Sequence, residues 1–326
     1  MGFSDDRAAS ARGRGRVVGS ARRYRNCLAA ASALLVVGCS GSATGSRATA
    51  PPAGAGGTGA AAPNAQGASP VDSASFASGA CISYPPTKGN RATTVFLDAG
   101  HGGLDPGASG RTTNGRVLTE KAITLAVVLD ATSKLQAAGF TVVVSRNTDT
   151  TVAKLTAGDV NGKLLTVPGV HADVEARARC ANKARAALLV SVHFNSGLSP
   201  RYGGAMSVYD AARPFSAENQ RFAGLLQASV LAQLNAHGWN IPNAGVVNDT
   251  GVGTALSSAA AAYGHLLILG PAKAGYFESP TTMPGALVEP LFLTDPFEAD
   301  VAAGPPGQQS IATGLVTAIT QQLAHG

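Results

Sequence analysis

The sequence predicts an α/β domain with a mostly parallel, twisted sheet and helices on both of its faces. Short apolar runs alternate with longer helical segments from residue 94 to residue 323, an order typical of parallel strands joined by right-handed crossovers. Several runs are apolar at every position, which suits strands covered on both faces. About 245 residues suffice for one core, and no internal repeat is present, so we expect a single catalytic domain over residues 81–326.

The first expected strand, Val95–Asp98, leads into a glycine-rich loop that holds His101. Residues 119–138 give the clearest helical pattern in the chain, because apolar residues recur at helical spacing. Thr119 is a suitable N-cap for this helix, and Gly139 is a suitable stop.

The remaining elements continue the alternation. We expect strands at Phe140–Ser145, Leu188–Val192, Ala205–Tyr209, Leu266–Leu269 and Ala286–Glu289, and helices at Ala172–Ala186, Ser216–Ala236 and Gln308–Leu323. Residues 147–172 are polar and rich in turn formers. Residues 240–263 are irregular apart from a short Ala-rich piece at Ser257–Tyr263.

The net charge of +6 is concentrated near the N-terminus. Residues 1–38 carry seven Arg and two acidic residues, so they contribute +5, and the rest of the chain is nearly neutral. The pI near 9.3 therefore gives no argument for binding to nucleic acid, and we expect none.

The same N-terminal residues have the pattern of an export signal. Arginines precede an apolar segment, Cys27–Gly38, that is too short to span a bilayer as a helix. It ends in Leu35-Val-Val-Gly-Cys39, which resembles the lipobox of bacterial lipoproteins. We therefore expect residues 1–38 to be a lipoprotein signal peptide and Cys39 to carry a lipid. The protein would then be exported to the periplasm or cell envelope and anchored to a membrane. Ordinary signal cleavage nearby is the alternative.

Residues 39–80 are almost entirely Ala, Gly, Ser, Pro and Thr, and we expect a disordered tether there. Beyond the anchor, only Cys81 and Cys180 remain. Outside the cytoplasm these two cysteines can form a disulfide, but Cys180 can equally be a small buried apolar residue, so the sequence leaves the bond open.

Four polar residues stand where predicted strands end or where the next helix begins. His101 follows the first strand, Glu120 opens the first helix, and His193 and Glu289 end later strands. In open α/β sheets, ligands bind outside the carboxyl ends of the strands, so we expect all four at one edge. Two imidazoles and one carboxylate are a common ligand set for catalytic zinc, and a further carboxylate can act as general base.

Six short motifs in order around these residues carry a resemblance. They are Leu97–Gly103 with Asp105–Ala108, Thr119–Lys121, Gly139–Val142 running to Arg146 and Asp149, Arg177 with Ala181-Asn182, Ser191–Asn195, and Leu287–Glu289. With them the chain resembles the zinc-dependent N-acetylmuramoyl-L-alanine amidases of type 3, which are cell-wall hydrolases.

This resemblance implies that His101, Glu120 and His193 bind one Zn²⁺ and that Glu289 is the catalytic carboxylate. It implies a peptidoglycan substrate, cut between N-acetylmuramic acid and L-alanine during cell-wall remodelling or daughter-cell separation. Asn195 lies two residues beyond a predicted ligand, and we expect it to orient the site or to contact substrate.

Several positions depart from the family pattern. Ala99 stands where Pro is usual. After Glu289 the family tends to have Leu-Gly-Phe and later Asn, where this chain has Pro290-Leu291-Phe292 and Asp295. Pro290 removes a backbone donor beside the predicted base, which bears on hydrogen bonding to substrate. Arg146 and Arg177 are expected to form structural ion pairs.

Regulation and rival functions stay open at this stage. We expect a monomer, with a protein activator or an inserted helix as means of restraint. The piece at Ser257–Tyr263 carries no acid, and Asp249 is the nearest one. A non-catalytic peptidoglycan-binding protein on the amidase fold is the alternative function. A nucleotide-binding protein is disfavoured, because the Gly100–Asp105 loop lacks the third glycine of the dinucleotide-binding motif and no GK[ST] follows.

Overall fold

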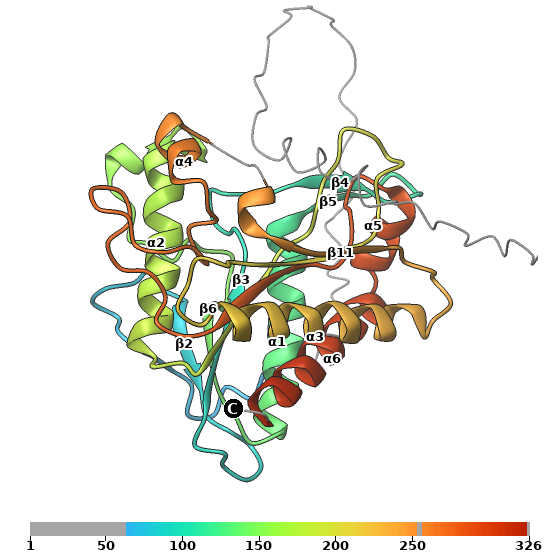
Figure 1. The fold of residues 1–326 in the computed structure, drawn as a ribbon, viewed down its shortest axis with the longest axis horizontal. Helices are drawn as coiled ribbons and strands as arrows, with labels where there is room; N and C mark the ends of the chain where they lie inside the picture. Colours follow the sequence, from blue (N-terminus) through green and yellow to red (C-terminus); the bar gives the residue numbers. More distant parts are fainter. Residues whose placement is uncertain (1–62, 253–255, 325–326) are drawn as a thin grey trace, which may run out of the picture.

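The computed structural model describes residues 63–252 and 256–324 (Figure 1). The predicted signal peptide, Cys39 and most of the predicted tether lie outside these residues. Among the described residues, no helix has both the length and the apolar character that crossing a membrane requires.

One eight-stranded sheet runs through the centre of the domain, in the order β1-β2-β6-β3-β9-β12-β10-β11. Its strands are β1 (Ser69–Pro70), β2 (Ala80–Tyr84), β3 (Thr94–Ala99), β6 (Thr141–Arg146), β9 (Leu188–Val192), β10 (Ala205–Tyr209), β11 (Asn243–Asn248) and β12 (Gly285–Glu289). Two small ribbons pair β4 (Ser109–Arg111) with β5 (Val117–Thr119) and β7 (Val160–Asn161) with β8 (Leu164–Leu165).

The helices cover both faces of this sheet. They are α1 (Glu120–Ala137), α2 (Val167–Lys183), α3 (Ser216–Asn235), α4 (Ser258–Tyr263), α5 (Pro296–Ala303) and α6 (Pro305–Ala324), with short 3₁₀ turns η1 (Ala157–Asp159) and η2 (Asp249–Gly251). Helices α1, α3 and α6 pack on the face that carries Val95 and Leu97, and α2 packs on the face that carries Phe96 (Figure 1). The predicted class, an α/β sheet with helices on both faces, is confirmed.

Strand direction divides the sheet into a parallel centre and reversed flanks. Strands β6, β3, β9 and β12 are parallel to one another. Strand β10 runs antiparallel to β12, with Met206 opposite Glu289, and β11 runs parallel to β10. The carboxyl ends of β10 and β11 therefore lie at the opposite edge from those of the four central strands.

The N-terminal boundary of the domain lies upstream of the predicted residue 81. Strand β1 extends the sheet, and Phe76 is 1% exposed within the core cluster on the α2 face. The predicted tether therefore ends earlier than residue 80, because β1 pairs with β2 and Phe76 is buried in the core.

The prediction of a strand at Leu266–Leu269 is wrong. These residues form a turn, in which the Leu269 N–H donates to the Leu266 carbonyl over 3.0 Å. Their side chains still pack against the core on the α2 face, and a short apolar run cannot separate a buried turn from a buried strand. Strands β2 and β11 and helix α5 were not predicted, since none of them has a clear apolar period.

Cys81 and Cys180 form a disulfide, which decides the point that the sequence left open. Their Cα atoms are 5.7 Å apart, and the bond links β2 to α2 across 99 residues of chain. Both cysteines are fully buried in the core on the α2 face.

Loss of this disulfide should destabilise the domain strongly. The double variant Cys81→Ala, Cys180→Ala is expected to lose about 4 kcal/mol of unfolding free energy, because a loop of this length gains much entropy in the unfolded chain. Guanidinium titration of the oxidised protein measures the loss. Reductant-treated wild-type protein is the matched control and should lose a similar amount, whereas an unchanged midpoint in both samples would contradict the prediction.

Candidate metal centre

Three donor side chains from three elements meet at the carboxyl edge of the central strands. His101 Nε2 lies 3.1 Å from Glu120 Oε1, and His193 Nδ1 lies 3.0 Å from the same oxygen. The two imidazole nitrogens are 3.2 Å apart. One ligand atom from each residue lies within 4.8 Å of the others, so the three predicted ligands are brought together.

Strand register explains how His101 and His193 become neighbours. Strands β3 and β9 are parallel, and Ala99 pairs with Val192 at their last position. His193 follows Val192 directly, and His101 follows Ala99 after Gly100. Glu120 joins them because it is the first residue of α1, whose start is tied to the loop by the bond from its own N–H to the Ala108 carbonyl over 2.8 Å. Thr119 stands at the N-cap but makes no side-chain capping bond.

The loop after β3 needs glycine where it passes the donors. A Cβ on Gly107 would lie 2.6 Å from the His101 ring and 2.7 Å from Glu120 Oε2, and one on Gly100 would lie 2.5 Å from the His193 ring. His101 itself has a φ of 61°, a left-handed conformation that an L side chain rarely adopts.

Two buried guanidinium groups hold this loop in shape. Arg177 forms ion pairs with Asp98 and Asp173, both at 2.7 Å, and donates to the carbonyls of Ala99 and His101. Its predicted role in structural ion pairs is confirmed.

Arg146 stabilises the same loop through hydrogen bonds to backbone carbonyl groups. It donates to the backbone oxygens of Ala99, Gly100 and His101 and, across to α1, of Lys121. The prediction of an ion pair for Arg146 missed this arrangement, because backbone acceptors leave no trace in a sequence.

Hydrogen bonds also orient the donor atoms. Asp105 Oδ2 lies 2.8 Å from His101 Nδ1, which directs Nε2 toward the other donors. The Ala108 N–H donates to Glu120 Oε2 over 2.7 Å, which leaves Oε1 facing the histidines. Sequence reasoning did not single out Asp105 for this role, although it lies in the same motif as His101.

The electrostatics of the three donors favour a cation between them. Burial alone would raise the pKa of Glu120, but His101 and His193 outweigh it and hold that pKa below its usual range. Burial lowers the pKa of His101, yet the Glu120 and Asp105 carboxylates outweigh it and raise the pKa to about 10. Both shifts come from attraction between the carboxylates and an imidazolium, and the same carboxylates would attract a metal ion that replaces the ring proton.

Glu289 places a second carboxylate beside this cluster. Val288 pairs with Val192 in the parallel strands β12 and β9, so Glu289 and His193 are the next residues of neighbouring strands. Within the described part of the chain, Glu289 Oε2 is buried without a hydrogen-bond partner. Burial and then the nearby Glu120 carboxylate raise the pKa of Glu289 to about 8.

Asn195 is buried, with 4% of its surface exposed, and joins two loops of the site. Its N–H donates to the Leu291 carbonyl, and its own carbonyl accepts from the Leu293 N–H. Backbone hydrogen bonds to Asn195 thus hold Leu291 and Leu293 in place, although Pro290 has no N–H to donate. The Asn195 Nδ2 has no partner among the described residues, and its predicted contact with substrate stays a prediction.

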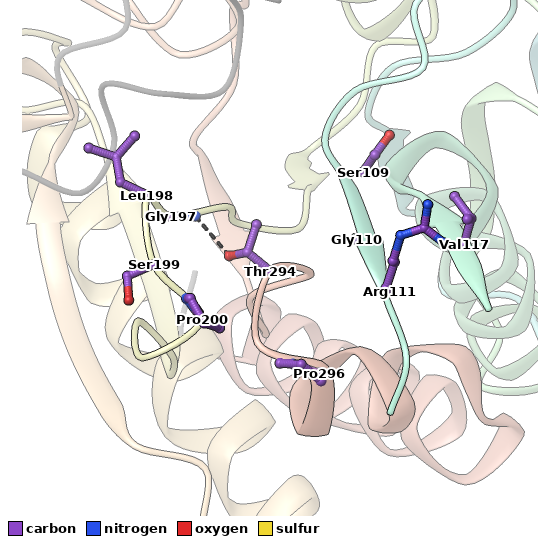
Figure 2. A pocket seen from close by; sticks show the side chains of 10 residues that line it. All are labelled: Ser109, Gly110, Arg111, Val117, Gly197, Leu198, Ser199, Pro200, Thr294 and Pro296. Atoms are coloured by element: carbon purple, nitrogen blue, oxygen red, sulfur yellow. Dashed lines mark hydrogen bonds between the residues drawn. The ribbon is translucent and has the colours of Figure 1, made fainter. Parts of the chain in front are cut away.

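A groove of about 460 Å³ opens beside these loops (Figure 2). It lies between the β4–β5 ribbon on one side and the loops after His193 and Glu289 on the other, which a bond from Gly197 N–H to Thr294 Oγ1 ties together over 2.9 Å. Arg111 and the 79% exposed Leu198 line it. Sequence reasoning missed these lining residues, although Gly197 and Leu198 lie two and three residues beyond Asn195.

The fold and the donor set are those of an α/β enzyme whose strand ends offer two imidazoles and a carboxylate to a metal ion. The chain belongs to the N-acetylmuramoyl-L-alanine amidase family, whose model matches residues 95–321. Its activity is accordingly that of an N-acetylmuramoyl-L-alanine amidase acting on peptidoglycan.

Known proteins agree with this membership. The germination-specific N-acetylmuramoyl-L-alanine amidase of Bacillus subtilis (strain 168) is 30% identical over 226 residues, which cover 69% of this chain and 77% of that protein. The solved CwlD amidase from Clostridioides difficile, in complex with the GerS lipoprotein, superposes with a TM-score of 0.53 at 21% identity, over 72% of this chain and 100% of that one. An N-acetylmuramoyl-L-alanine amidase from Clostridium difficile 630 has a TM-score of 0.50 at 23% identity, over 71% and 97%. These two solved structures have the same fold as this chain.

Asp105 should matter for metal affinity through His101. The variant Asp105→Asn is expected to weaken metal binding about 10–100-fold, because the bond that orients the ring would lose its charge. Competition with a chromophoric chelator measures the affinity. Asp159→Asn, which changes a half-buried acid in the capping box of η1, is the matched control. Equal affinities in the two variants would argue against the role of Asp105.

Proposed function

We propose that this amidase depends on Zn²⁺ held by His101, Glu120 and His193, with Glu289 as its catalytic carboxylate. The observation that carries the proposal is the convergence of three donor atoms beside the unpartnered carboxylate of Glu289. Two histidines and one acidic residue match the ligand types of catalytic zinc sites.

The chemistry divides between the metal and the chain. Zinc at this site would supply a Lewis acid for the scissile carbonyl and would make a water more acidic. Glu289 would accept a proton from the attacking water and pass it to the leaving amine of L-alanine. A pKa raised to about 8 suits a group that must accept and then release a proton near neutral pH.

The groove beside the site supports a substrate that extends in two directions from the cut bond. It is lined by Gly110 and Gly197, by apolar side chains that include Val117 and Leu198, and by Arg111. A glycan strand and a carboxylate-bearing stem peptide have matching chemistry. Cell-wall remodelling or daughter-cell separation is the proposed setting.

Chelation should abolish activity, and zinc should restore it. Wild-type protein stripped with EDTA is expected to release no L-alanine-terminated peptide from defined muropeptides until Zn²⁺ is added back, with product measured by mass spectrometry. Full activity in the stripped protein would overturn the metal requirement. Release of no product under any condition would instead favour the alternative, a non-catalytic peptidoglycan-binding protein.

Glu289→Gln provides the matched control. It should retain one zinc at this site yet lose about 10²–10⁴ in kcat, because only the proton transfer is removed. Loss of zinc together with activity would make Glu289 a ligand and not the base.

We further propose that the protein is an exported lipoprotein held to a membrane through Cys39. The support is the Arg-rich and apolar N-terminus that ends at this cysteine. Membrane attachment by acyl chains contributes about 0.8 kcal/mol per buried methylene, so a multiply acylated cysteine gives a stable anchor. A monomeric state and a protein activator remain part of the proposal. One solved amidase of similar fold is itself in complex with a lipoprotein.

Cys39→Ala should release the protein from membranes. Fractionation of cells is expected to move the variant from the membrane to the soluble fraction, while the muropeptide-cleaving activity per molecule stays unchanged. Cys81 and Cys180 are bonded to each other, so neither can take over the anchor. A variant that stays with the membrane would rule out lipidation of Cys39 as the anchor.

A further inference from the structure

A second cluster of metal-ligating side chains lies away from the first. His265 Nδ1 is 2.8 Å from Asp210 Oδ2 and 3.3 Å from Asp249 Oδ1. One ligand atom from each residue lies within 4.8 Å of the other two. Both carboxylate side chains are fully buried, and the imidazole is 18% exposed.

Strand register assembles this cluster as it assembles the first. Strands β10 and β11 are parallel, and Tyr209 pairs with Asn248 at their last position. Asp210 and Asp249 are the next residues of the two strands. His265 comes to them from the chain after α4, which turns at Gly264 in a left-handed conformation with a φ of 75°.

The cluster is separate from the candidate catalytic centre. Met206 of β10 faces Glu289 in the antiparallel pair with β12, and the register continues toward Gly285 at the other end of β12. Asp210 therefore lies about four residues from Glu289 along the strand, or about 13 Å at the usual rise.

Backbone donors orient the two carboxylates. The Ala212 N–H donates to Asp210 Oδ1, and the Leu266 N–H donates to Asp249 Oδ2 over 2.9 Å. In each carboxylate the second oxygen is thereby directed toward His265 Nδ1. This is the arrangement seen around Glu120, where a backbone N–H binds one oxygen and leaves the other for the histidines.

The hydrogen-bonding capacity of these three side chains is not satisfied within the cluster. A single Nδ1–H can serve one carboxylate well, and within the described residues Asp210 Oδ2 has no hydrogen bond with acceptable geometry. The nearest other polar groups are engaged elsewhere: Arg213 donates to Leu269, Gly270 and Thr281, and the Tyr263 hydroxyl donates to the Pro271 carbonyl.

We propose that Asp210, Asp249 and His265 form a second metal site, which takes a structural divalent transition metal, Zn²⁺ foremost. Two carboxylate oxygens and one imidazole nitrogen are hard and borderline donors, and zinc binds such sets more tightly than manganese or iron(II). The exposed part of His265 leaves a path for the ion and for a water as fourth ligand.

A metal here would join three segments that are far apart in sequence. It would tie the ends of β10 and β11 to the chain after α4. Asp249 was the acid nearest to the Ala-rich piece considered as an inhibitory insertion. In the structure Asp249 belongs to the cluster with Asp210 and His265, which lies at the sheet edge opposite to Glu289.

Metal stoichiometry of the full chain tests the proposal. After stripping with EDTA, exposure to excess ZnCl₂ and desalting, wild-type protein should retain two zinc ions per chain by elemental mass spectrometry. Asp249→Asn and His265→Gln should each retain one ion and keep the muropeptide-cleaving activity. His237→Gln is the matched control histidine, because His237 stacks on Trp239 and bonds Ser310 far from both clusters, and it should retain two.

The double variant His101→Ala, His193→Ala separates this site from the catalytic one. It should still bind one zinc, and saturating zinc at about a hundred times the dissociation constant should raise its melting temperature by about 5–10 °C. Adding Asp249→Asn should abolish that shift. One zinc in wild-type protein and none in the double variant would overturn the proposal and leave an imidazolium between two carboxylates. One zinc in wild-type protein that survives in the double variant would instead refute the catalytic zinc site.

Discussion

The candidate active site depends on two buried guanidinium groups, those of Arg146 and Arg177. Between them they bind the backbone carbonyls of residues 99–101 and of the start of α1. A buried cation is costly unless it is fully hydrogen-bonded, so the loop must present its carbonyls inward in one conformation. That conformation turns the His101 backbone into the left-handed region and points its side chain at Glu120.

Parallel strand pairing then determines which residues meet. Strands β3, β9 and β12 lie side by side and end at one edge, so the residues after their last pairs become neighbours although nearly 190 residues separate the first from the last in sequence. The donors come from different elements; Asp105 orients His101, and the Ala108 N–H orients Glu120. The groove is made from the continuations of these same loops, so it opens beside the donors.

The reversed strands give the domain a second set of strand ends. Because β10 and β11 run against β12, their carboxyl ends face away from the candidate catalytic centre and carry two buried aspartates. Residues that follow neighbouring parallel strands meet at the edge where those strands end, and this holds for β10 and β11 as it does for the central strands. Among the described residues no arginine forms a salt bridge with either carboxylate here, whereas Asp98 and Asp173 are both paired with Arg177. Arg177 neutralises the first pair of carboxylates, which makes them a structural ion-pair network. Asp210 and Asp249 have no such arginine, so their cluster suits a cation.

The sequence by itself determined the alternation of strands and helices, and it identified His101, Glu120, His193 and Glu289, because local periodicity and short motifs are properties of adjacent residues. It did not determine the direction of β10, the turn at Leu266–Leu269, or the start of the ordered domain before residue 81. The bond between Cys81 and Cys180, the carbonyl contacts of Arg146 and the meeting of His265 with two aspartates were likewise decided only by tertiary structure. All of these depend on which distant segments pack together, and pairing energies between distant strands leave no local pattern in the chain.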